Sequence, residues 1–245
     1  MENNQKILCT LHGGSHLYGL NTPTSDIDYR GVFCNTHYSY ILGTKRFDEE
    51  RRQNPDTQDD YVMKELNHFM NLLKMANSEA LEILFAPEDV FTFIDDSIKE
   101  IRANRYSLID SNKLFKCLCG YMQGELKLAL GERRGRIGGK RYEQVIQYGF
   151  SPKNMCQLLR LSYMGMTFFK ADTLPVRLEG SIKEQLLDIK VNPQNYTADQ
   201  LTKQVITAEE EMKSAYDDRV KDHHFSEQIA NELLYKIYLP FLIKT

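Results

Sequence analysis

Residues 13–31 read Gly-Gly-Ser-His-Leu-Tyr-Gly-Leu-Asn-Thr-Pro-Thr-Ser-Asp-Ile-Asp-Tyr-Arg-Gly, and no other stretch of the sequence indicates as much about the chemistry of the protein. A Gly-Gly-Ser turn that opens a helix offers unpaired backbone N–H groups to an anion. Eleven residues after Ser15 come Asp26 and Asp28. On a strand, these two side chains point to the same face because side chains alternate with a period of two. Together the turn and the aspartates predict a site that holds a polyphosphate beside a divalent cation.

The sequence around this stretch predicts the strands of a small mixed sheet. A short apolar run, Lys6–Leu11, is followed by two glycines and is typical of a strand. A second strand is predicted from Asp26 to about Phe33, and a third over Asp60–Met63, which leads into an amphipathic helix. Residues 44–59 are polar and rich in charge, so they are predicted to form a mobile loop.

The second half of the chain carries a different pattern. Beyond Asn104, strand signals nearly vanish and apolar residues recur at helical spacing, with Ser151 and Thr197 placed as helix N-caps. We therefore predict an α+β fold class. Its N-terminal domain, residues 1–104, has a mixed sheet flanked by helices, and its C-terminal domain, residues 105–245, is all-helical.

The composition sets limits on the class of protein. Of the 245 residues, 42% are hydrophobic and 27% are charged, as in a globular protein, and the net charge of −3 argues against a uniformly basic nucleic-acid coat. The N-terminus lacks the apolar run of a signal peptide, and no stretch approaches the roughly 20 apolar residues that span a bilayer. Five cysteines without zinc-ligand spacing are expected to be reduced thiols. These features predict a cytoplasmic protein without a membrane partner.

Asp26 and Asp28 are the first candidates for metal ligands. Mg²⁺ prefers carboxylates and water and usually bridges to substrate phosphates, and Mn²⁺ suits the same ligands. Two such ions, about 3.5–4 Å apart, hold the attacking and leaving oxygens of an in-line displacement at phosphorus. A third carboxylate from a neighbouring strand would complete the set. Asp59 and Asp60 both qualify, and Asp60 is favoured because it directly precedes an apolar run. For Asp26 and Asp28, the alternative to a metal site is a turn followed by a solvated strand end.

Several basic residues are candidates for phosphate contacts. Arg30 points to the same face as the aspartates, where it either contacts a phosphate or neutralises the acidic cluster. Lys153 and Arg160 lie seven residues apart on one helix face, which would bind a triphosphate or an acceptor strand, or form a salt bridge between domains. A glycine-rich segment would clamp a nucleic-acid backbone or serve as a solvated connector; its basic residues are Arg133, Arg134, Arg136, Lys140 and Arg141.

At these residues the sequence resembles the DNA polymerase β nucleotidyltransferase superfamily, whose signature is a Gly-Ser turn followed by Asp-x-Asp and a later acid. Within it, the sequence is similar to the RNA repair pathway DNA polymerase β family of predicted nucleotidyltransferases. The similar blocks are residues 14–20, 25–33, 60–66 and 77–85, and in the helical half Gly120-Tyr121, Lys153-Asn154 and Leu158–Leu161. One departure is Gln157, which stands where such proteins tend to have a histidine.

The resemblance implies Mg²⁺-dependent transfer of a nucleotide from an NTP donor. It implies Asp26, Asp28 and Asp60 as catalytic metal ligands, and Gly14 and Ser15 at the triphosphate. We expect a hydroxyl acceptor, first of all at the end of an RNA such as a tRNA or an RNA-repair substrate. Two alternatives are transfer to a protein hydroxyl and a non-catalytic nucleotide- or RNA-binding module on the same fold. The sequence does not name the nucleotide or the oligomeric state.

Overall fold

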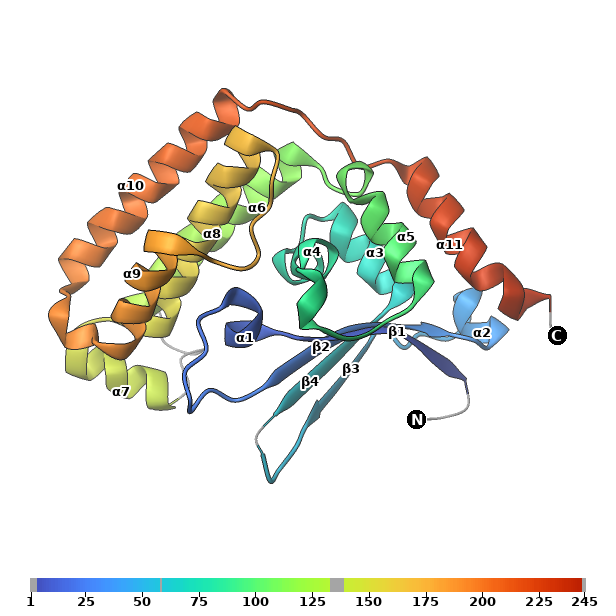
Figure 1. Cartoon of the computed structure of the whole chain (residues 1–245), viewed down its shortest axis with the longest axis horizontal. Helices are drawn as coiled ribbons and strands as arrows, with labels where there is room; N and C mark the ends of the chain where they lie inside the picture. The colour runs from blue at the N-terminus through green and yellow to red at the C-terminus, as the bar shows by residue number, and fades with distance from the viewer. Residues whose placement is uncertain (1–3, 58, 133–138, 244–245) are drawn as a thin grey trace. The chain divides into compact units, whose positions relative to one another are not determined.

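Five strands of the first half of the chain pair into one mixed sheet (Figure 1). The structure is a computed structural model that describes residues 4–57, 59–132 and 139–243. The strands lie side by side in the order β3-β4-β2-β1-β5. Their bounds are Gln5–His12 (β1), Asp28–Asn35 (β2), Glu49–Gln53 (β3), Asp60–Glu65 (β4) and Phe91–Ile94 (β5).

The pairing of β2 with β4 sets the geometry of the sheet. The two strands run parallel, with Asp28 opposite Asp60 and Tyr29 opposite Tyr61. Paired residues point to the same face, so the two acids share one face while the tyrosine rings stack on the other, with centroids 4.5 Å apart. β1 pairs antiparallel with β2 and β5, and β3 is an edge strand antiparallel to β4.

Two strand assignments differ from the sequence-based expectation. The sequence predicts a loop over residues 44–59, but the structure has strand β3 within that segment. Every residue of β3 is polar or charged. Charged side chains on an edge strand prevent its unpaired backbone groups from pairing with another chain, and such a strand lacks the apolar alternation by which strands are predicted. The second strand starts at Asp28 and not at Asp26, so Asp26 lies in the preceding loop.

Helices α3, α4 and α5 lie on one side of the sheet (Figure 1). The amphipathic pattern that predicts a helix after β4 is confirmed in α3, where the residues that make up the pattern are all buried: Leu66, Phe69, Met70 and Leu73. The helices of this region are α1 (Gly14–Tyr18), α2 (Tyr38–Ile41), α3 (Leu66–Lys74), α4 (Ser78–Phe85) and α5 (Asp96–Ala103), with 3-10 turns at Glu88–Val90 and Arg105–Ser107.

The chain divides into two compact units, Met1–Asp110 together with His223–Thr245, and Ser111–Asp222. The second unit is helical, as expected, and consists of α6 (Ser111–Ala129), α7 (Gly139–Tyr148), α8 (Pro152–Ala171), α9 (Gly180–Val191), a 3-10 turn (Pro193–Asn195) and α10 (Ala198–Asp217). A Cβ at Gly165 of α8 would stand 2.6 Å from Leu118 of α6 and from Met212 of α10, so glycine allows these three helices to pack closely. No helix among the residues described is both long and apolar enough to cross a membrane.

The last helix, α11 (Glu227–Leu242), belongs to the first unit. The predicted boundary assigns all of residues 105–245 to the helical domain, whereas in the structure residues 223–245 group with the sheet. The reason is a buried contact: the Tyr238 hydroxyl donates a hydrogen bond to the carboxylate of Glu65, which also caps the N-terminus of α3. An ion pair of 2.7 Å between Lys236 and Glu100 adds a second link.

Burial sets the chemistry of this contact. Burial raises the pKa of Glu65, although the hydrogen bond from Tyr238 and those from backbone N–H groups act against the rise. Burial and the neighbouring carboxylate also raise the pKa of Tyr238, so the phenol stays protonated and remains a donor. The hydrogen bond from Tyr238 therefore stabilises the fold at pH values at which Glu65 is ionised, because the buried carboxylate then needs a donor.

We expect Tyr238→Phe to lower the free energy of unfolding by about 1.5–3 kcal/mol near neutral pH, because it removes a hydrogen bond to a buried charge. When the pKa of a carboxyl is higher in the folded state, the free energy of unfolding falls as pH rises through that pKa. Without the phenol, the folded-state pKa of Glu65 rises further. The deficit of the variant should therefore shrink in acid, where Glu65 is protonated. Urea denaturation across pH measures both effects. Tyr235→Phe is the matched control, because Tyr235 is 65% exposed on the same helix.

Candidate active site

The Gly-Gly-Ser turn joins β1 to the short helix α1. Gly13 is the N-cap of α1, and its backbone N–H donates a hydrogen bond of 2.7 Å to the carbonyl oxygen of Asp28. Gly14 has a φ of +54°, in the left-handed region that favours glycine, and Gly19 ends the helix at a φ of +72°. The turn is therefore fixed to the first residue of β2 by its own backbone.

Two side chains of β2 lie directly against the glycines. A Cβ placed on Gly14 would stand 1.8 Å from Oδ2 of Asp28, and one on Gly13 would stand 2.6 Å from Cγ of Arg30. Both positions must be glycine because these side chains occupy the space that a Cβ would take. Asp28 and Arg30 thus project on the same face of β2, as the alternation of side chains predicts, and that face is the one on which the turn lies.

Asp60 is the first residue of β4, directly across from Asp28 in the parallel register. Its side chain is exposed on the same face. Asp59 is engaged differently: Oδ1 accepts a hydrogen bond of 3.2 Å from the backbone N–H of Ile27, and Oδ2 accepts one of 2.7 Å from the Thr57 hydroxyl. Between the two alternatives that the sequence leaves open, the geometry favours Asp60 as the acid that faces the site.

Asp26 is exposed in the loop that precedes β2. Because Asp26 is outside the strand, strand alternation does not place its side chain on the same face as that of Asp28. Within residues 4–57, 59–132 and 139–243, no three His, Cys, Asp or Glu side chains stand close enough together to hold a metal ion. The donor chemistry still suits a hard divalent cation, because Asp28 and Asp60 offer carboxylate oxygens from paired strand positions.

The remaining predicted site residues lie in the second unit. Lys153 is exposed on α8, whereas Arg160 of the same helix is only 1% exposed and donates a hydrogen bond of 3.1 Å from Nε to the Gln157 side chain. Of the predicted basic segment, residues 133–138 lie outside the described part of the chain, and Arg141 belongs to α7.

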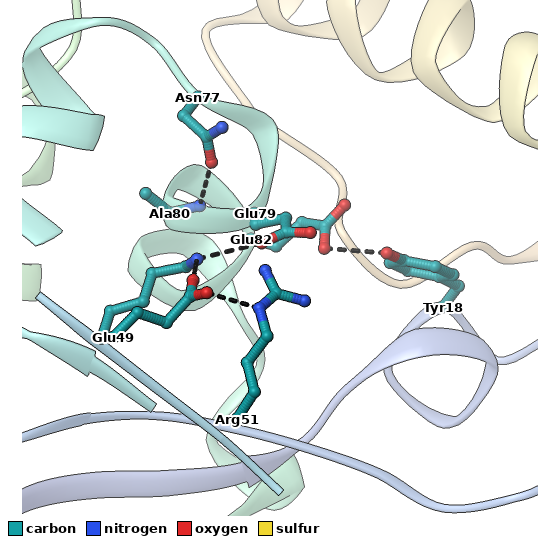
Figure 2. Close-up of polar contacts among 8 residues, drawn as sticks. Tyr18, Glu49, Arg51, Asn77, Glu79, Ala80 and Glu82 are labelled. Atoms are coloured by element: carbon teal, nitrogen blue, oxygen red, sulfur yellow. Dashed lines mark hydrogen bonds and ion pairs between the residues drawn. The ribbon is translucent and has the colours of Figure 1, made fainter. Parts of the chain in front are cut away.

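A network of charges beneath α4 has no clear signal in the sequence (Figure 2). The ammonium group of Lys64 is buried and forms ion pairs with Glu49 at 2.9 Å and Glu79 at 3.1 Å. Burial tends to raise the pKa of Glu49, but hydrogen bonds from Arg51 and Lys64 hold it below its ordinary value. The register of β3 beside β4 creates this network, since it pairs Glu49 with Lys64 and Arg51 with Val62.

A second contact in the same region fixes α1. The hydroxyl of Tyr18, the last residue of α1, donates a hydrogen bond of 2.8 Å to the carboxylate of Glu82, which is buried on α4 (Figure 2). The side chain of Asn77 caps α4 by accepting from the backbone N–H of Ala80 at 3.2 Å. A five-residue helix has little stability of its own, so Tyr18 and Glu82 hold the helix that follows the Gly-Ser turn.

This geometry, a Gly-Ser turn with an aspartate of one strand packed against it and a second acid on the next strand, defines a nucleotidyltransferase-like site. Residues 1–234 match the RNA repair pathway DNA polymerase beta family, and the chain belongs to that family. This is the family that the sequence predicts.

The proteins similar to this chain include one curated phage protein and one solved structure. An uncharacterized 38.9 kDa protein encoded in the nrdC-mobD intergenic region of Enterobacteria phage T4 is 28% identical over 118 residues, which cover 45% of this chain and 34% of that protein. The chain thus spans about a third of the length of its curated relative. A solved nucleotidyltransferase-like protein from Exiguobacterium sibiricum 255-15 is 10% identical, with a TM-score of 0.33, over 99% of this chain and 85% of that one. The assignment therefore rests on the family match.

We expect Gly14→Ala to destabilise the protein by about 2–4 kcal/mol, because a Cβ adds left-handed strain and displaces the carboxylate of Asp28. Gly43→Ala is the matched control: Gly43 also has a positive φ, +76°, but has open space around its Cα, so it should lose only about 1 kcal/mol. Chemical denaturation measures both losses.

The double variant Gly14→Ala/Asp28→Ala separates the two causes. Removal of the carboxylate should recover the part of the loss that comes from the collision and leave the part that comes from strain. Equal losses in the Gly14 and Gly43 variants, or no recovery in the double variant, would contradict the packing of Asp28 against Gly14.

Proposed function

We propose that this chain is a Mg²⁺-dependent nucleotidyltransferase that transfers a nucleotide from an NTP to a hydroxyl at the end of an RNA. The observation that carries the proposal is the contact of Asp28 with Gly14, together with the register that sets Asp60 opposite Asp28. It brings two carboxylates next to a turn suited to phosphate. The RNA acceptor is supported by the family, which is described as an RNA repair pathway family.

The proposed reaction is an in-line displacement at the α-phosphorus of the NTP. Gly14 and Ser15 orient the β and γ phosphates, and Arg30, whose stem packs on Gly13, offers its charge to a phosphate oxygen. The acceptor oxygen forms the new bond to phosphorus, the bond from phosphorus to the bridging oxygen breaks, and pyrophosphate leaves. Asp60 takes the proton of the acceptor hydroxyl, as its exposed carboxylate permits.

The same carboxylates would hold the metal. Asp28 and Asp60 supply oxygen ligands from paired strands, and Asp26, two residues before Asp28, would supply a third from the loop. When bound, Mg²⁺ (or Mn²⁺) would neutralise phosphate charge and lower the pKa of the acceptor hydroxyl. In the second unit, Lys153 is a proposed phosphate contact because it is exposed, whereas the burial of Arg160 favours a structural role.

The cysteines support a reducing compartment, which we propose to be the cytoplasm. All five are free thiols. Burial raises the pKa of Cys9, Cys34 and Cys156 to about 12, so these thiols stay protonated and unreactive. No step of the proposed reaction uses a cysteine.

Asp28→Asn and Asp60→Asn should each reduce transfer by about a hundredfold or more, because they remove a metal ligand or the general base. Asp56→Asn, the same change of charge in the exposed turn before β4, should leave transfer unchanged. The assay incubates the full chain with each α-labelled NTP, Mg²⁺ and either an RNA pool or a protein extract, and separates the products.

Each outcome of this assay has a distinct meaning. Label on RNA that is lost in the Asp28 and Asp60 variants supports the proposal. Label on a protein band alone indicates transfer to a protein hydroxyl. Nucleotide binding without label from any NTP indicates a binding module, and near wild-type transfer by both variants rules out the proposed acids.

A further inference from the structure

Arg51 stands on the same face of the sheet as the two acids. It pairs with Val62 across β3 and β4, so Asp60 is its diagonal neighbour two residues along β4. Side chains at such diagonal positions are within reach of one another when one of them is long. Because Asp60 shares its face with Asp28, Arg51 is a cation at the border of the proposed site.

The side chain of Arg51 is held at one end and open at the other. Its Nε donates a hydrogen bond to Oε1 of Glu49, and Glu49 is fixed in turn by Lys64, whose side chain is only 4% exposed. In the part of the chain that the structure describes, the two terminal nitrogens of Arg51 have no hydrogen-bond or ion-pair partner, and the side chain is 65% exposed. Figure 2 shows these nitrogens pointing away from Glu49.

The electrostatic surroundings keep Arg51 charged. The hydrogen bond to Glu49, the charges of Glu49 and Glu79 and that of Asp60 together raise the pKa of the guanidinium. Glu49 is also compensated by Lys64, so it orients Arg51 without taking up the whole charge. An oriented guanidinium with two open N–H₂ groups matches two oxygens of a phosphate.

The strand order tells on which side of the site Arg51 lies. The Gly-Ser turn follows β1 and packs against Asp28 and Arg30 of β2, so the donor triphosphate is proposed on the β1–β2 side. Asp60 on β4 is the proposed acceptor of the hydroxyl proton. β3 lies beyond β4, on the side away from the turn. Arg51 is therefore on the side that the proposed function assigns to the acceptor hydroxyl.

We propose that Arg51 binds a backbone phosphate of the acceptor RNA close to its reactive hydroxyl. This inference rests on the proposed function and adds to it the requirement that the acceptor carries a phosphate near its end. A neutral hydroxyl compound or an unmodified protein side chain lacks the group that Arg51 binds.

The test compares Arg51→Gln with Arg52→Gln in the full chain. Arg52 is the matched control: it is the next residue of β3, points to the opposite face, and pairs with Glu50, so both variants lose one positive charge. Fluorescence anisotropy measures the binding of a short fluorescein-labelled RNA with a free 3′ hydroxyl, and calorimetry measures the binding of ATP, GTP, CTP and UTP. Thermal denaturation checks that both variants fold.

Arg51→Gln should weaken RNA binding about tenfold, the loss expected for one charged hydrogen bond, and leave NTP binding unchanged. Arg52→Gln should change neither. With an RNA whose last linkages are neutral methylphosphonates, wild type and Arg51→Gln should bind equally well. Arg51→Lys, which keeps the charge but not the fork, should lose less than Arg51→Gln and provides a second variant should Arg51→Gln fail to fold.

Other results overturn the inference. Weaker NTP binding with unchanged RNA binding would make Arg51 a contact of the donor. Equal weakening in the Arg51 and Arg52 variants would indicate non-specific charge, and absence of RNA binding by wild type would remove the RNA acceptor. The proposed function is judged separately, by the labelling assay with the Asp28 and Asp60 variants.

Discussion

The close approach of the Asp28 carboxylate to the backbone of Gly14 is the constraint on which the first unit depends. It requires glycine at a left-handed position and ties the turn after β1 to the start of β2. The parallel pairing of β2 with β4 then carries this constraint across the sheet and sets Asp60 beside Asp28. A turn and two acids that are distant in sequence are thereby held as one rigid group, which is what the proposed catalysis at phosphorus needs.

A second layer of charges supports this group from the side of α4. Lys64 is buried between Glu49 and Glu79, and the loss of both carboxylates would leave its charge uncompensated in a poorly solvated place. The network therefore links β3, β4 and α4. Tyr18 extends the same support to α1 through Glu82. The candidate site thus lies on elements fixed from two directions, by backbone pairing within the sheet and by ion pairs and hydrogen bonds to α4.

The sequence predicts the parts of this fold that follow from local periodicity. The strand before the glycines, the start of β4 at Asp60 and the helical second half are visible in alternation, turn residues and caps. β3 is not visible, because an edge strand made of charged residues has the composition of a loop. The position of α11 is not visible either, since Tyr238 and Glu65 are 173 residues apart and only the folded chain brings them together. The sequence does not single out Arg51 either, because its place beside Asp60 depends on the pairing of β3 with β4.

The return of the last helix to the sheet has a consequence for biosynthesis. The chain leaves the first unit after Asp110 and re-enters it at His223, where the backbone N–H of Ser226 bonds to the carbonyl oxygen of Ser107 at 2.8 Å. During translation, the intervening helices therefore emerge and can fold while Glu65 still has no phenol beside it. The ribosome must add more than a hundred residues before the sheet unit is complete, so a prematurely terminated chain would carry an intact Gly-Ser turn on an unfinished fold.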